Sequence, residues 1–153
     1  TDYGQELAQN STLEFRSEKA INPNLKYEGQ WIAGTNIRHG RGRQTWKDGT
    51  VYEGWFKNDK AEGKGRLVHA DGDVYNGDWE HDKAHGFGTY MHGNGARYEG
   101  QWMNDKQHGV GKETWPDGSQ YEGEYKKGLK NGKGVFKWED GNQYEGEFQE
   151  NNI

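Results

Sequence analysis

Histidine is the residue type in this sequence best suited to metal chemistry, and there are six of them. His39, His85 and His108 each precede a Gly-x-Gly pair. His69 and His92 occupy equivalent places in two successive copies of a repeated sequence unit. Equivalent residues of neighbouring hairpins lie about 9 to 10 Å apart in a sheet, whereas zinc needs each ligand nitrogen within about 2.1 Å. The isolated HDKAH at 81–85 is a weak motif. We therefore predict no metal site and interpret these histidines as solvated loop residues.

Other motifs that could do chemistry are also better explained by structure. Asp71-Gly72-Asp73 has Tyr75 at the fifth position of a would-be calcium loop, so we interpret it as a turn. The Gly-x-Gly pairs precede no expected helix, which removes the usual phosphate cradle. Ser11, Ser17 and Ser119 belong to no nucleophile motif. We predict no catalytic residue, no cofactor and no enzymatic activity in this segment.

The histidines and glycines named above belong to sequence units that repeat along the chain. Tyr-x-Gly begins each unit, at Tyr27, Tyr52, Tyr75, Tyr98, Tyr121 and Tyr144, with steps of 25, 23, 23, 23 and 23 residues. With this Tyr as position 0, position 2 is Gly and position 4 is aromatic in every unit. A Gly-x-Gly pair follows at positions 11 and 13, and Asp-Gly or Asn-Gly ends the unit. The period of two and the hairpin turn signal predict one β-hairpin per unit.

A register can be proposed from the charges. Pairing position 4 with position 11 leaves a six-residue loop, and sets position 1 opposite 14 and position 3 opposite 12. The pairs that result are Glu28–Arg43, Glu53–Arg66, Glu99–Lys112, Glu124–Lys133, Asn76–Thr89 and, as an exception, Glu122–Val135. Opposite charges facing each other stabilise neighbouring strands. A bulge or a longer loop is needed at Asp-Gly if position 17 is to share a face with the next Tyr.

Large rings supply most of the apolar material of a polar chain. Only 29% of residues are hydrophobic and the net charge is -5, yet there are 7 Trp and 9 Tyr. We expect positions 0 and 4 to form a structural stripe along one face, with Gly beside the rings as a flat packing surface. The stripe comprises Tyr27, Trp31, Tyr52, Phe56, Tyr75, Trp79, Tyr98, Trp102, Tyr121, Tyr125 and Tyr144.

The domain organisation follows from the repeats. We expect a flexible segment over 1–10, an N-terminal cap strand over 11–26 that turns at Asn22-Pro23-Asn24, and the repeat array over 27–153. The units are 27–51, 52–74, 75–97, 98–120, 121–143 and a partial 144–153. Because the last unit is incomplete and residue 1 is not Met, we expect a fragment of a longer array. There is no Cys and no run of about 18 apolar residues, so we expect a cytoplasmic chain that spans no membrane.

Units of the form Tyr-Glu-Gly-x-Trp, His-Gly-x-Gly and Trp-x-Asp-Gly resemble MORN (membrane occupation and recognition nexus) repeats. The resemblance covers about 27–150, with departures at the two extra residues in 32–39, at Asn76, and at Gln44 and Glu113. It implies an elongated, single-layer antiparallel sheet with an aromatic groove. It also implies a docking role in varied hosts, including ciliary, cytoskeletal and junctional proteins and the neighbours of lipid kinase domains.

The predicted function is a protein-interaction scaffold. Position 17 varies among aromatic residues, which suits a surface that selects a partner peptide or helix. The predicted partner-binding residues are Trp46, His69, His92, Trp115 and Trp138, with Tyr90 and Phe136. Weak contact with anionic lipids is the first alternative, through the run Lys126, Lys127, Lys130 and Lys133; an accessory domain of a larger enzyme is the second. An acidic chain argues against nucleic acid. From the resemblance, we expect assembly into a larger cytoskeletal or ciliary complex.

Overall fold

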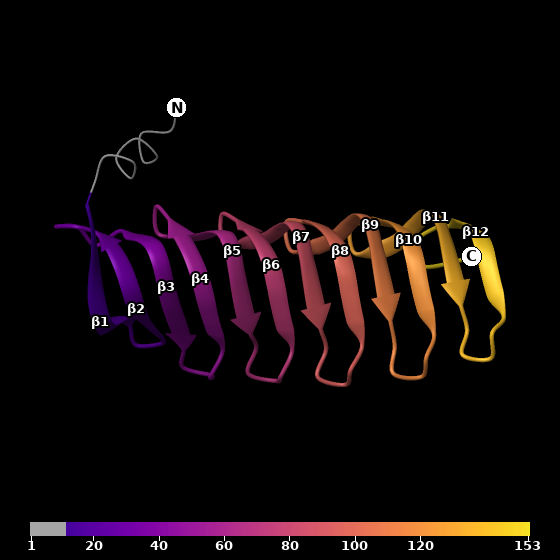
Figure 1. Ribbon diagram of the computed structural model, residues 1–153, viewed down its shortest axis with the longest axis horizontal. Coiled ribbons are helices and arrows are strands. Elements are labelled where there is room, and N and C mark those ends of the chain that lie inside the picture. Colours follow the sequence, from indigo (N-terminus) through magenta and orange to yellow (C-terminus); the bar gives the residue numbers. More distant parts are fainter. Residues whose placement is uncertain (1–11) are drawn as a thin grey trace, which may run out of the picture.

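The computed structural model describes residues 12–153 as one antiparallel sheet whose strand order follows the sequence from β1 to β12. Figure 1 shows the strands side by side along the long axis of the molecule, with one row of connecting loops along the lower edge. The predicted all-β, single-layer repeat architecture is therefore confirmed. The expected flexible segment 1–10 lies outside the described residues. The strands are β1 Leu13–Asn22, β2 Leu25–Ile32, β3 Arg38–Trp46, β4 Val51–Lys57, β5 Lys60–Val68, β6 Val74–Glu80, β7 Lys83–Met91, β8 Arg97–Met103, β9 Lys106–Thr114, β10 Gln120–Lys126, β11 Leu129–Lys137 and β12 Gln143–Phe148.

The hairpin inside each unit closes differently from the predicted register. In β4–β5, Gly54 lies opposite Gly65 but Phe56 lies opposite Ala61, so the single residue at position 3 faces a bulge of β5 at positions 10–12, which replaces the predicted 4-to-11 pairing. The turn has only two residues, Asn58 and Asp59, with φ of 49° and 73°. Both left-handed conformations identify a type I′ turn, which matches strand twist and which Asn and Asp tolerate. The six-residue loop was wrong because the bulge takes up the extra residues.

The predicted 4-to-11 pairing does occur, but between neighbouring units. Trp79 at position 4 faces Gly63 at position 11 of the preceding unit. The connection between units is a longer loop, as predicted for the case in which position 17 shares a face with the next Tyr. Near Gly49, the amide of Trp46 donates to the carbonyl of Thr50 at 2.9 Å, and the amide of Gly49 donates to the carbonyl of Trp46 at 3.0 Å. Gly49 has a φ of 97°, so the loop is a turn followed by a left-handed glycine bulge, which returns position 17 to the face of the next Tyr.

The rings form a continuous zipper along one face, here called the inner face. Each position-0 Tyr meets the position-4 ring of its own unit and that of the next, as Tyr52 does with Phe56 and Trp79, both with centroids at 5.1 Å. The interplanar angles of 86° and 84° are edge-to-face geometry, worth about 0.5 to 1.5 kcal/mol per pair beyond area burial. Tyr27 and Tyr121 are 0% exposed. A single sheet can bury rings this fully only by bending around them.

The bend sits at the paired glycines of positions 2 and 13. A Cβ on Gly65 would overlap the ring of Tyr52, and a Cβ on Gly54 would overlap the backbone of Gly65. The carbonyl at position 3 lies opposite the bulge, and the Tyr hydroxyl of the same unit donates to it. The Tyr52 hydroxyl donates to Trp55 O at 2.8 Å, and the same bond recurs from Tyr27, Tyr75, Tyr98, Tyr121 and Tyr144. In each Tyr-x-Gly motif the Tyr ring therefore packs on the paired glycines, and its hydroxyl binds the carbonyl at position 3.

The opposite, outer face carries most of the predicted charge pairs. The register places Glu28 opposite Arg43, Glu53 opposite Arg66 and Glu99 opposite Lys112, and the Asn76–Thr89 and Glu122–Val135 pairs are also confirmed.

The Glu124–Lys133 pair was wrong. Lys133 lies opposite Glu147 in the ladder, because Glu124 falls in the bulge of its hairpin. The Glu124 carboxylate instead accepts a hydrogen bond from the backbone amide of Lys133 at 2.7 Å.

Strand β1 covers the start of the array. It pairs with β2 from Leu13 opposite Ile32 to Asn22 opposite Leu25, with the turn at 23–24. Arg16 and Lys19 lie over the Trp31 ring, at 4.9 and 5.6 Å from its centroid. Within residues 12–153, no helix is long and apolar enough to cross a membrane.

Candidate partner-binding groove

A groove runs along the inner face between the two rows of turns. Three hollows of about 400, 310 and 320 Å³ follow one another from β2 to β9. The first two share Leu67, Trp79 and Asp82, and the last two share Tyr90, Trp102 and Asp105, so they form one continuous channel. We call this channel the inner groove.

The structure places all seven predicted partner-binding residues on the ring-bearing face, beside the zipper. Trp46, His69, Tyr90 and His92 line the inner groove, whereas Trp115, Phe136 and Trp138 lie outside its three hollows. Six of the seven form two aromatic groups, and Trp46 packs against the buried rings. In the first, the centroids of His69 and Tyr90 lie 6.1 Å apart and those of Tyr90 and His92 lie 4.7 Å apart. In the second, Phe136 lies 5.6 Å from Trp115 and 4.8 Å from Trp138.

Exposure separates these residues from the zipper. Trp138 is 41% exposed, while Trp46 and Trp115 are half-buried and pack against the core. The zipper residues are buried, apart from the half-buried Trp102 and Tyr144. The zipper therefore serves as the floor of the inner groove, and position 17 presents side chains that a partner can reach.

A hydrogen-bonded carboxylate sits at the rim of the groove. Asp73 accepts hydrogen bonds from the Tyr90 hydroxyl at 2.7 Å and the Gly93 amide at 2.8 Å, and lies 3.6 Å from Nδ1 of His92. The bond from Tyr90 is the main cause that lowers the pKa of Asp73. Burial, followed by the Asp73 bond, raises the pKa of Tyr90. Asp73 therefore keeps its negative charge at neutral pH.

Sequence reasoning missed the aspartates of the two-residue turns. The Asp82 carboxylate accepts a hydrogen bond from the Ala61 amide of the preceding unit at 2.7 Å, and Asp105 does the same for Ala84 at 2.7 Å. Both aspartates also line the inner groove. The available signal was the recurrence of Asp at position 7 in three successive units, at Asp59, Asp82 and Asp105.

The prediction of loop histidines was wrong for His39, His85 and His108, which lie in β3, β7 and β9, and the first two have a structural role. The amide of Asn58 donates to Nδ1 of His39 at 3.1 Å, and the amide of Asn104 donates to Nδ1 of His85 at 3.4 Å. Burial, followed by nearby Lys57, lowers the pKa of His39, which keeps that ring neutral and able to accept. Among the described residues, no group of three His, Cys, Asp or Glu side chains could hold a metal ion.

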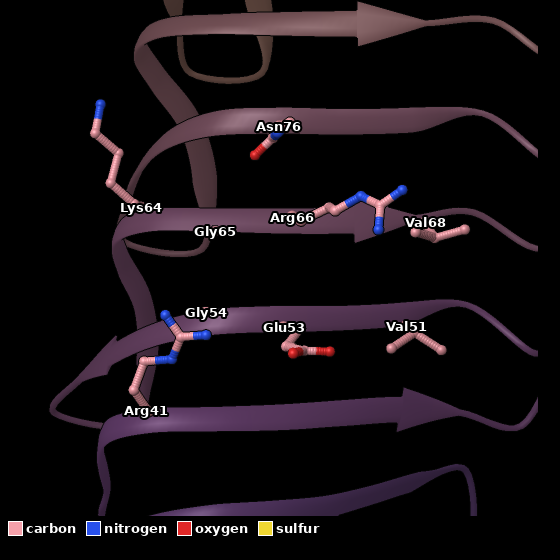
Figure 2. A pocket seen from close by; sticks show the side chains of 9 residues that line it. All are labelled: Arg41, Val51, Glu53, Gly54, Lys64, Gly65, Arg66, Val68 and Asn76. Carbon is pink, nitrogen blue, oxygen red and sulfur yellow. The ribbon is translucent and has the colours of Figure 1, made fainter.

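The outer face has a shallow hollow between β3 and β6 with three basic residues, Arg41, Lys64 and Arg66. Figure 2 shows that these side chains extend in different directions instead of converging. Lys64 pairs with Asp78, and the Arg41 guanidinium lies 5.5 Å from the centroid of the Trp55 ring. The hollow therefore does not concentrate positive charge at one point.

The predicted lysine run is divided between the faces. Lys130 lies over the Trp115 ring, 5.3 Å from its centroid, whereas Lys133 faces Glu147 in the ladder.

The fold is an open β-repeat array in which each unit supplies a pair of zipper rings, and the units from β2 to β9 also line the inner groove. The MORN repeat family matches residues 27–51, 52–74, 75–97, 98–120 and 121–143, so the chain belongs to the MORN repeat family. A search of curated proteins finds no significant match to the chain. MORN repeats occur in proteins of protein interaction and membrane association, and their array is typically a noncatalytic fold.

Proposed function

We propose that the chain is a noncatalytic docking module whose inner groove binds a segment of another protein. The observation that carries this proposal is the continuous, ring-lined channel that one sheet layer leaves open to solvent. Apolar surface of this kind typically marks an interaction site, and Trp anchors in it contribute most of the binding energy. From family membership, we propose a cytoplasmic setting in a cytoskeletal or ciliary assembly.

Binding to an anionic membrane has weaker support. The lysine run is split between the two faces, and the basic residues of the outer hollow have acidic or aromatic neighbours. A polybasic lipid patch needs several unpaired cations on one surface.

The test compares two double variants in a pull-down from cytoplasmic and cytoskeletal extract. Trp46→Glu with His69→Glu places two charges in the groove, which both residues line, and Phe87→Glu with Val110→Glu places two on the outer face, where the native side chains are 54% and 57% exposed. We expect specific proteins to be lost with the groove variant and kept with the outer-face variant, both confirmed as folded by circular dichroism. Equal recovery by all three forms would contradict groove docking.

A further inference from the structure

The inner groove is acidic as well as apolar. Asp82 and Asp105 line it from the two-residue turns, and Glu113 lines its third hollow. The loops along the opposite rim carry Asp48, Asp71, Asp73, Asp117, Glu139 and Asp140. Cations also border the groove: Arg38 lines the first hollow and is bound to Asp59, with Nε and Oδ1 at 2.9 Å, Lys106 lines the third hollow, and Lys47 lies in the opposite loops. The carboxylates of the lining and of the opposite loops outnumber these cations, so the apolar floor has a net negative border.

The groove floor has no main-chain groups to offer a partner. Strands β2 to β11 each pair with a neighbour on both sides, so their backbone amides and carbonyls are directed within the sheet. An extended peptide lying across the floor would place its own amides and carbonyls against rings without partners, which costs free energy. An α-helix satisfies its backbone internally and presents only side chains.

From these observations we propose that the groove selects an amphipathic α-helix whose apolar stripe is flanked by Lys or Arg. This inference rests on the proposed docking function and names its partner class. The stripe packs on Leu67, Trp79, Tyr90 and Trp102, where the small Ala84 leaves room for large side chains. The flanking cations meet the carboxylates on the two sides of the groove.

The repeat spacing sets the spacing of the cations. Successive turn aspartates are one unit apart, about 9 to 10 Å along the sheet. A helix rises about 1.5 Å per residue, so seven residues advance about 10.5 Å and return to nearly the same side. A flank with Lys or Arg at every seventh residue therefore matches Asp82 and Asp105 in succession.

The test uses three helical peptides of about 20 residues, a length that covers about three units. All three carry the same Leu stripe; their flanks carry Lys, Gln or Glu at every seventh residue. Binding to the folded chain is measured by fluorescence anisotropy at low and high salt. We expect the Lys peptide to bind about tenfold or more tighter than the Glu peptide at low salt, with the ratio shrinking at high salt.

A matched pair of charge variants locates the effect. Asp82→Asn with Asp105→Asn removes two groove charges and keeps the amide acceptor, because Asn151 already accepts the Lys130 amide in the same way at 2.9 Å. Glu122→Gln with Glu145→Gln removes two charges from the outer face, on either side of Val135. We expect the groove variant to weaken the Lys peptide about three- to tenfold and the outer-face variant to leave it within about twofold.

The outcomes separate this inference from the docking function. Equal binding of the three peptides, lost with Trp46→Glu and His69→Glu, would overturn the charge preference and leave groove docking in place. No binding of any peptide, with specific proteins still captured through the groove in the pull-down, would overturn the helical partner alone. Failure of that pull-down as well would overturn both.

Discussion

At the scale of single residues, the Tyr hydroxyl of each unit has a measurable role in stability. The Tyr75 hydroxyl donates to the carbonyl of Asp78 at 2.8 Å, and this Tyr is 2% exposed. Replacing Tyr75 with Phe keeps the ring and leaves the carbonyl without its partner, so we expect a loss of about 1 to 3 kcal/mol in the free energy of unfolding. Tyr144→Phe removes the same bond from a half-buried residue whose hydrogen bond is exposed to solvent, and should cost less. Urea denaturation measures both, and equal losses would contradict the role of burial.

The same tyrosines predict alkaline unfolding. Burial is the largest cause that raises the pKa of Tyr27 and of Tyr121 to about 12, whereas an unfolded Tyr titrates near 10. The folded state therefore holds its protons to higher pH than the unfolded state. The stabilisation is complete below about pH 10 and is lost as the pH rises towards 12. Tyrosinate absorbance and circular dichroism should change together in this range; ionisation near pH 10 with the fold retained would show that the hydroxyls are solvated.

At the scale of the structural element, the two-residue turns connect neighbouring units. Asp82 in the β6–β7 turn accepts the amide of Ala61 in β5, and Ala61 is 5% exposed. We expect Asp82→Ala to destabilise the chain by about 1 to 3 kcal/mol, because the buried amide loses its acceptor and Ala tolerates the left-handed φ of 68° less well than Asp.

Asp82→Asn is the matched control for the turn. It retains the acceptor oxygen and should stay within about 0.5 kcal/mol of the native chain. Thermal denaturation of the three proteins measures the difference. If Asn were as costly as Ala, the carboxylate charge and not the hydrogen bond would be the stabilising feature.

The sequence predicted these elements unevenly. The aromatic and glycine positions recur in every unit and alternate with a period of two, so the hairpins and the ring-bearing face could be predicted. The close of the three middle hairpins could not, because their turns, such as Asn58-Asp59, carry no glycine, the usual signal of a type I′ turn. The bulge does have a residue signature, because the first glycine of each Gly-x-Gly pair lies in it with a left-handed φ, as Gly63 does at 85°. We interpret that glycine from the sequence as a flat packing surface, so the signal was present and was assigned to another role.

The residues of the groove were also predicted only in part. Tyr90 and the position-17 residues were candidates because they are aromatic in a recurring column. Asp82 and Asp105 were missed because their place on the groove wall depends on the unpredicted turn. A correct register would have placed them there.

At the scale of the whole molecule, each strand pairs only with its neighbours in the sequence. The zipper rings also contact only neighbouring units. For example, the ring centroids of Tyr98 and Tyr125, in adjacent units, lie 5.2 Å apart. In arrays of this kind, stability is approximately a sum of repeat and nearest-neighbour contributions. A defect should therefore loosen its own region more than distant units.

Gly111→Ala tests this locality, because a Cβ there would overlap the Tyr98 ring at the crease between β8 and β9. Overpacking of this kind costs about 1 to 3 kcal/mol. We expect hydrogen exchange measured by mass spectrometry to show about 5- to 100-fold faster exchange in β8–β11 and little change in β2–β4. Gly93→Ala is the control, since its nearest neighbouring atom is 3.5 Å from the added Cβ. Uniformly faster exchange from β2 to β12 would mean that the array unfolds as one cooperative unit and that the nearest-neighbour description is wrong.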